Sequence, residues 1–199
     1  MPAETDERYH HGNLRAALLA AAEQTARESG VDALSLRDLA RQVGVSHAAP
    51  RRHFPDRQSL LDALAVNGFQ RIDTELRAAV ARAGDDFVAR LKALTQTYTR
   101  FATRDAALLE LMFSRKHGEN ADVFLAAAQP SFTLLEDLLQ EGQVQGVLRE
   151  GPIDQIGIVL FATMHGIAAM TNGHLAPPDL LEGLANTAVE QFVRGAGRA

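Results

Sequence analysis

The residues of this chain best suited to chemistry are the hydrogen-bond donors and small side chains of the stretch SHAAPRRHF, which spans residues 46–54. Arginine and histidine donate to phosphates and base edges, small residues let a backbone approach a base closely, and alanine can contact the thymine methyl group. This composition indicates contact with nucleic acid. The residues of the stretch that we predict to contact DNA are Ser46, His47, Ala48, Ala49, Arg51, Arg52 and His53.

The chain just before this stretch predicts a helix and a tight turn. Apolar residues recur at three- and four-residue steps from Leu36 to Val43, which predicts one buried helix face. Ser35 precedes that face and can cap its first turn, whereas Gly44 follows it and tolerates the left-handed conformation of a helix end. Ser46 can then cap a second helix over residues 46–54, disrupted mildly by Pro50. A helix, a short turn and a second helix form the layout of a DNA-binding helix-turn-helix.

Three residues outside the second helix complete the predicted DNA contacts. Ser35 and Arg37 belong to the first helix, and Arg57 begins a long third helix, where the helix dipole favours a phosphate. Basic residues at the start of the chain could also touch the DNA backbone, although a frayed polar tail explains them equally well: Arg8, His10, His11 and Arg15. The alternative for the whole region is an ordinary helical hairpin with a solvated basic face.

The net charge of −5 would repel DNA, but the distribution of charge along the chain agrees with DNA binding. Residues 34–58 contain five arginines and two aspartates, which makes this segment basic before its histidines are counted. A local basic face is sufficient for docking, because only the docking surface neutralises phosphates.

Composition excludes several other classes of protein. The chain has 199 residues, 46% of them hydrophobic, and no cysteine, so disulfides, thiolate metal sites and cysteine nucleophiles are absent. The start of the chain lacks the apolar region of a signal peptide. The longest apolar run, Ile156–Met170, is interrupted by Thr163 and His165 and is shorter than the ~20 residues of a membrane span. We therefore predict a cytoplasmic protein with no membrane partner.

The remainder of the chain predicts further helices and no strands, so the fold class is all-α. Ile153–Gly173 is apolar nearly all round, which in a soluble protein means burial on more than one side. A helix from about Ala121 contains Pro130, which indicates either a kink or two helices that meet there. No catalytic constellation, phosphate-binding loop or metal-ligand spacing stands out, so we predict no catalytic residue, no metal site and no cofactor.

Some aromatic and soft side chains of these helices could contact a small molecule, although such a stripe is more often plain core. His165 is the strongest candidate for contact with a small molecule, because a polar ring in an apolar helix needs a hydrogen-bond partner. The partner is either a carbonyl of the core or a ligand. The candidates are Tyr98, Phe101, Met112, Phe124, Phe132, Met164 and His165.

Three segments together resemble the DNA-binding domain of the TetR family of bacterial transcriptional regulators. They are YHHGNLRAALLAAA at residues 9–22, LSLRDLARQVGVSHAAPRRHFPD at residues 34–56, and the following SLLDAL. One difference is Arg51, where such sequences commonly carry tyrosine. The MHG segment around His165 is similar to a subgroup whose C-terminal domain carries an aromatic–His-Gly signature, with Phe161 where that subgroup often has tryptophan.

The resemblance implies a helix-turn-helix DNA-binding domain at residues 1–56 and a helical ligand-binding and dimerisation domain at residues 57–199. It further implies a homodimer through the two C-terminal helices, binding to a palindromic double-stranded DNA operator, and release by a small-molecule effector. We therefore predict a repressor. The alternatives are an activator of the same fold, and a small-molecule-binding helical protein whose N-terminal hairpin has only a structural role.

Overall fold

The computed structural model describes residues 7–114 and 121–197, and this part of the chain is almost entirely helical. Its only β-type pairing is an isolated bridge between Leu148 and Gly197. The all-α fold class is confirmed. The elements in order are α1 (Glu7–Ser29), η1 (Val31–Ala33), α2 (Leu36–Gln42), η2 (Ala49–Arg52), α3 (Arg57–Arg82), α4 (Phe87–Arg104), α5 (Ala106–Ser114), α6 (Ala121–Val144), α7 (Ile153–Asn172), η3 (Pro178–Leu180) and α8 (Leu181–Ala196), where η marks a 3₁₀ turn.

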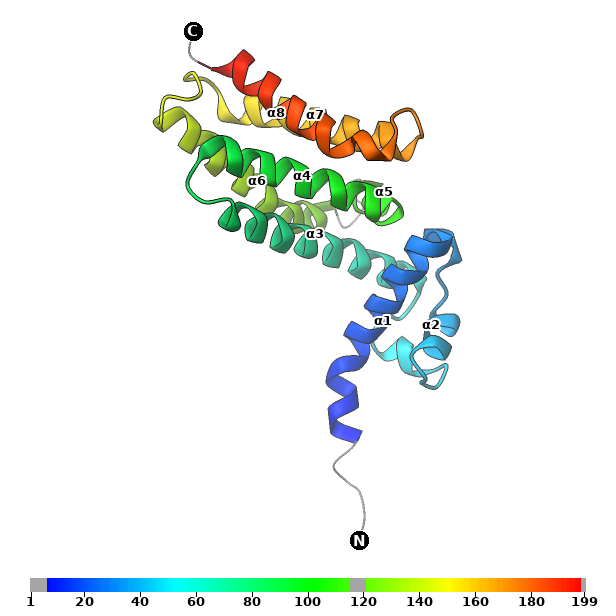
Figure 1. Ribbon diagram of the computed structural model, residues 1–199. Coiled ribbons are helices and arrows are strands. Elements are labelled where there is room, and N and C mark those ends of the chain that lie inside the picture. The colour runs from blue at the N-terminus through cyan, green and yellow to red at the C-terminus, as the bar shows by residue number, and fades with distance from the viewer. Residues whose placement is uncertain (1–6, 115–120, 198–199) are drawn as a thin grey trace. The chain divides into compact units, whose positions relative to one another are not determined.

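Contacts divide the chain into two compact units. The smaller unit comprises Met1–Gly68 and Ala107–Phe124, and the larger unit comprises Phe69–Ala106 and Leu125–Ala199. Helix α3 contributes to both units, with its residues up to Gly68 in the smaller unit and those from Phe69 in the larger unit (Figure 1). The domain boundary predicted after residue 56 stays a prediction.

The smaller unit holds α3 and α5 unusually close together. A Cβ atom placed on Gly68 of α3 would lie 2.6 Å from the sulfur of Met112 and 3.3 Å from Leu108. Such distances are too short for any larger side chain without movement of its neighbours. The core of this unit also contains the fully buried side chains Leu18, Leu39, Phe54, Leu60 and Leu64.

In the larger unit, α4 packs against both α7 and α8 (Figure 1). The side chains of α4 that face this core include Leu91, Leu94 and Phe101, each at most 2% exposed. Helix α6 continues through Pro130, so the alternative of two helices meeting at that residue is wrong. The guanidinium of Arg77 donates to the carbonyl of Pro130 at 2.9 Å and thereby joins α3 to α6.

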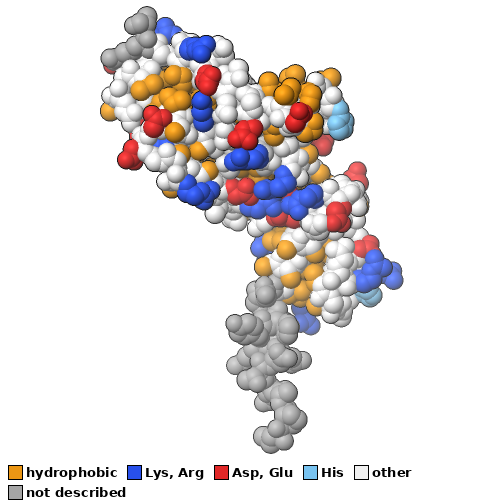
Figure 2. All heavy atoms as spheres, in the orientation of Figure 1, with side chains coloured by type: hydrophobic (Ala, Val, Ile, Leu, Met, Phe, Trp, Pro, Cys, Tyr) orange, Lys and Arg blue, Asp and Glu red, His pale blue; other side chains and the backbone are white. Residues whose placement is uncertain are grey.

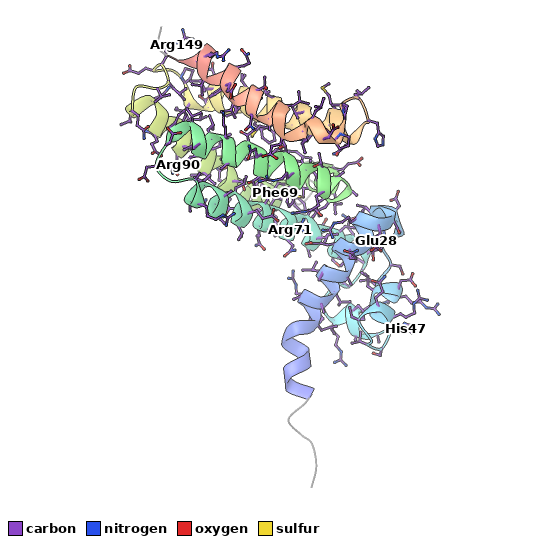
Figure 3. All side chains as sticks on the ribbon, in the orientation of Figure 1. Glu28, His47, Phe69, Arg71, Arg90 and Arg149 are labelled. Carbon is purple, nitrogen blue, oxygen red and sulfur yellow. The ribbon has the colours of Figure 1, made fainter. Side chains whose placement is uncertain are left out.

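A buried carboxylate ties α3 to the end of α4. Asp105 is 3% exposed and accepts hydrogen bonds from Arg71 Nη2 at 2.5 Å and from Arg104 Nε at 2.8 Å. Both guanidinium groups also lie over the ring of Phe101, 4.9 and 5.6 Å from its centroid. Arg104 Nη2 additionally reaches Glu75 at 2.9 Å. Figure 3 labels Arg71 on α3.

We expect Asp105→Ala to lower the free energy of unfolding by about 2–4 kcal/mol, because it leaves two arginines without their shared buried partner. Asp73→Ala is the matched control, since it removes a carboxylate that pairs with the more exposed Arg77 on the surface of α3. The control is expected to change stability by less than about 1 kcal/mol. Urea unfolding followed by circular dichroism measures both, and equal losses would refute a special role for Asp105.

Candidate functional site

The first helix of the predicted helix-turn-helix, α2, begins and ends as the sequence indicates. The hydroxyl of Ser35 accepts a hydrogen bond from the backbone N–H of Asp38 at 3.4 Å, which caps the helix. Gly44 adopts φ 74°, and the N–H of Val45 donates to the carbonyl of Ala40 at 2.9 Å. The cap and the glycine turn are thus confirmed. Ser35 acts through the backbone of its own helix.

The second helix is much shorter than predicted. In place of a helix over residues 46–54, the structure has a 3₁₀ turn at Ala49–Arg52, preceded by a non-helical turn. Pro50 has no N–H to donate and disfavours the α conformation at Ala49, which interrupts a regular helix. The predicted side-chain cap at Ser46 is also wrong: only its carbonyl is used, accepting from Ala49 N–H at 3.0 Å, and Ala48 occupies the cap position.

The short turn nevertheless has one buried side and one exposed side. Pro50 and Phe54 are buried, and the guanidinium of Arg15 lies 5.6 Å from the centroid of the Phe54 ring. Figure 3 shows His47 on the side of the turn that faces away from α1. Among the predicted DNA contacts, Ser35, Ala49 and His53 are half-buried, and those exposed to solvent are Arg37, Ser46, His47, Ala48, Arg51, Arg52 and Arg57.

Arg57 has partners that the sequence does not reveal. Its Nε donates to the carbonyl of Leu34 at 3.1 Å and its Nη2 donates to the carbonyl of Val31 at 2.9 Å. These bonds join the start of α3 to the segment before α2, so Arg57 holds the smaller unit together. Its contact with a phosphate stays a prediction. The side chains of Arg8, His10 and His11 lie outside the described residues.

The start of α3 is capped by Asp56. Its carboxylate accepts from the backbone N–H of Ser59 at 2.7 Å. This backbone bond, together with the Ser59 side chain, holds the pKa of the Asp56 carboxyl below its usual value. The cap therefore remains charged at neutral pH and complements the positive end of the helix.

In the larger unit, an aromatic cluster surrounds His165. The hydroxyl of Tyr98 lies 2.8 Å from His165 Nδ1, and Phe161 is stacked on the His165 ring with centroids 5.7 Å apart. Phe161 also contacts Tyr98 and Phe132 edge to face, with centroids at 5.6 and 5.2 Å. Burial raises the pKa of the Tyr98 phenol well above its ordinary value, so this group is a neutral donor or acceptor.

The structure brings together only part of the predicted ligand-contacting set. Tyr98, Phe132 and His165 share the cluster, whose centre is Phe161, one helical turn before His165 and absent from the predicted set. Helical spacing around His165 was the signal that could have identified it. Phe101 lies under the two arginines described above, Met164 is buried in α7, and Met112 and Phe124 belong to the smaller unit.

Helix α7 presents an apolar face to solvent. Ile158 is 64% exposed, Val159 60% and Met170 48%, and Leu175 follows in the turn after the helix. By length and composition α7 could cross a membrane, so the sequence-based estimate that it is too short is wrong. Only 22% of its most apolar window is buried within the chain. A helix of this kind needs a further partner to cover its exposed side.

Within residues 7–114 and 121–197, no group of three potential metal-ligating side chains lies close enough together to hold an ion. The candidate functional surfaces are an exposed set of donors on a short turn and an aromatic cluster in a helical bundle. A small helical unit of this type followed by a helical bundle defines the class of helix-turn-helix transcriptional regulators.

Comparison with known proteins identifies the family. Residues 18–64 match the model for bacterial regulatory proteins of the tetR family, and residues 91–192 match the model for the tetracyclin repressor-like C-terminal domain. The chain therefore belongs to the TetR family of transcriptional regulators. Members of this family bind DNA operators and act as dimers. No curated protein matches the sequence.

Solved structures extend the similarity over nearly the whole chain. A protein of unknown function from Rhodococcus sp. RHA1 is 42% identical, with 97% of this chain and 100% of that chain covered and a TM-score of 0.88. The fatty acid degradation regulator FadR from Bacillus halodurans is 19% identical, with coverage of 90% and 98% and a TM-score of 0.74. A Rhodococcus transcriptional regulator is 20% identical, with coverage of 93% and 98% and a TM-score of 0.70. The last two show the fold alone.

Proposed function

We propose that this protein is a dimeric repressor that binds a palindromic operator and is released from it by a small molecule. The observation that carries the proposal is the 46–53 turn, which anchors Pro50 in the core and leaves its donors in solvent. Small side chains at Ala48 and Ala49 allow the backbone to approach the major groove closely. A buried anchor beneath exposed donors is the arrangement that base readout requires.

The exposed residues divide into base readers and phosphate ligands. His47 and Ala48 precede the 3₁₀ turn and are proposed to contact base edges. Arg37, Arg51 and Arg52 are proposed to bind mainly phosphates, with Arg51 also able to reach a base, because a guanidinium can donate two bonds to guanine. Ser46 and the half-buried His53 contribute donors at the edges of the contact.

The first prediction concerns sequence-specific DNA binding. Selection from a random DNA pool should recover a palindrome with half-sites about one helical turn or more apart. His47→Ala should reduce discrimination against a changed base by about 1–3 kcal/mol. Arg37→Gln should weaken binding to all sequences, and the slope of log affinity against log salt concentration should become smaller by about one. Arg27→Gln, an exposed arginine of α1 outside the predicted contacts, is the control. Equal losses for His47→Ala on operator and random DNA would refute base reading.

The proposed dimer uses the exposed face of α7 together with α8. We expect Ile158→Glu to raise the dissociation constant of the dimer by about tenfold or more, because it places a charge in the centre of an apolar interface. Val144→Glu is the control, since Val144 is 82% exposed at the end of α6 and outside this face. Analytical ultracentrifugation at micromolar concentration measures both variants. A wild-type monomer at that concentration would contradict the proposal.

The effector is proposed to bind at the aromatic cluster. The neutral Tyr98 hydroxyl and the His165 ring supply polar groups next to the aromatic rings of Phe132 and Phe161, which suits a ligand that combines an apolar body with a polar group. The effector would shift the protein toward a state with lower operator affinity. Repression rather than activation is part of the proposal, as is a cytoplasmic location.

A screen for small molecules that release the selected operator tests this assignment. A molecule that releases the wild-type protein should be about tenfold less potent on Tyr98→Phe, because one hydrogen bond to the ligand is lost. Operator affinity in the absence of the molecule should be unchanged. Unaltered potency on both Tyr98→Phe and His165→Asn would place the effector elsewhere.

A further inference from the structure

A groove in the larger unit lies between α3 and α4 and is distinct from the aromatic cluster. Its volume is about 590 Å³, within the range of small-molecule sites. Figure 2 shows basic side chains, with acidic ones among them, on this face of the larger unit. The residues that line the groove are Thr74, Glu75, Ala78, Arg82, Thr97, Arg100, Thr103 and Arg104.

The charge in the groove is positive and only partly neutralised. Glu75 is the single carboxylate in the lining, and it is paired with Arg104 at 2.9 Å. Over the part of the chain that the structure describes, no carboxylate forms an ion pair with Arg82 or Arg100. The only hydrogen bond recorded for Arg100 is a long one, 3.5 Å, to the hydroxyl of Thr97. Two exposed guanidinium groups therefore remain available in a chain whose net charge is −5.

The threonines of the groove add polar groups of a second kind. Thr74 donates its hydroxyl proton to the carbonyl of Gln70, and Thr103 donates to the carbonyl of Thr99, both at 2.9 Å. Their oxygens therefore have lone pairs left to accept hydrogen bonds. The groove thus combines cationic donors with neutral acceptors, which suits a ligand with an anionic end and hydroxyl groups.

We propose that the α3–α4 groove binds a small hydroxylated molecule that carries a phosphate group. Arg82 and Arg100 would hold the phosphate, because guanidinium groups form charge-assisted and bidentate hydrogen bonds with its oxygens. The ligand hydroxyls would donate to Thr74 and Thr103. This is a second ligand site of the larger unit, independent of the effector proposed at His165.

Isothermal titration calorimetry of the full-length protein with ribose 5-phosphate tests the proposal, with ribose, inorganic phosphate and citrate as comparison probes. We expect binding of ribose 5-phosphate, and a dissociation constant raised by about tenfold in Arg100→Gln and in Arg82→Gln. Binding tighter than that of inorganic phosphate would identify a phosphate ester, and equal binding of the two would identify the phosphate group alone as the recognised chemistry. The first result supports the proposal, and the second would overturn its assignment to a hydroxylated ligand.

Arg27→Gln is the control, because it removes the same charge from α1 and should leave binding unchanged. Thermal unfolding checks that each variant is folded. An absence of heat up to about ten millimolar ribose 5-phosphate, or equal effects of the groove variants and the control, would overturn the proposal. Preference for citrate would overturn the assignment to phosphate.

DNA is the other polyanion to test. If Arg82→Gln and Arg100→Gln lower affinity for random DNA and leave ribose 5-phosphate binding unaltered, the groove is a DNA-backbone surface and the proposal fails. The calorimetry contains no DNA. Failure to find an operator would therefore contradict the proposed function and leave the result on ribose 5-phosphate binding unaffected.

Discussion

The buried carboxylate of Asp105 is the constraint on which the arrangement of α3 and α4 in the larger unit depends. A charge that is 3% exposed is tolerated only when strong donors surround it, and here two arginines from different helices supply them. Phe101 lies beneath both guanidinium groups, 4.9 and 5.6 Å from them. The position of α3 relative to the end of α4 is thus set by directional bonds as well as by apolar packing.

The same network extends into the surface groove through Arg104, which contacts both Asp105 and Glu75. Helix α4 consequently contributes side chains to two chemically different environments. Tyr98 points into the aromatic cluster of the core, whereas its neighbour Thr97 lines the groove. Successive residues of a helix point about 100° apart, so a single helix can contribute to an aromatic cluster on one side and to a basic groove on another.

Much of the fold was predictable because it depends on local chemistry. The Ser35 cap, the left-handed Gly44 and the extent of α7 each follow from a few adjacent residues, and each was confirmed. The length of the second helix was not predicted correctly, because the effect of Pro50 on its neighbours outweighed the helical pattern. The partners of Arg57 lie 23 and 26 residues away in the chain, and no spacing rule indicates them.

The candidate sites were harder to predict than the fold, for a related reason. A ligand site needs residues from several helices, and the register between helices is decided by packing. Residue type identified Tyr98 and His165 as candidates, but the sequence could not show that they lie in contact across two helices. The α3–α4 groove likewise arises only when Thr74 and Arg104, far apart in sequence, line the same space.

The brevity of the 3₁₀ turn has a consequence for how the protein finds its site in a genome. With base contacts confined to residues 46–53, as proposed, one copy would distinguish only a few base pairs and would meet acceptable half-sites very often. The number of competing sites falls steeply when two half-sites must be matched at a fixed separation. Under the proposed binding of a dimer to a palindrome, specificity would therefore depend on spacing, and mutations that alter the distance between the two copies would change the targets without touching any residue proposed to read a base.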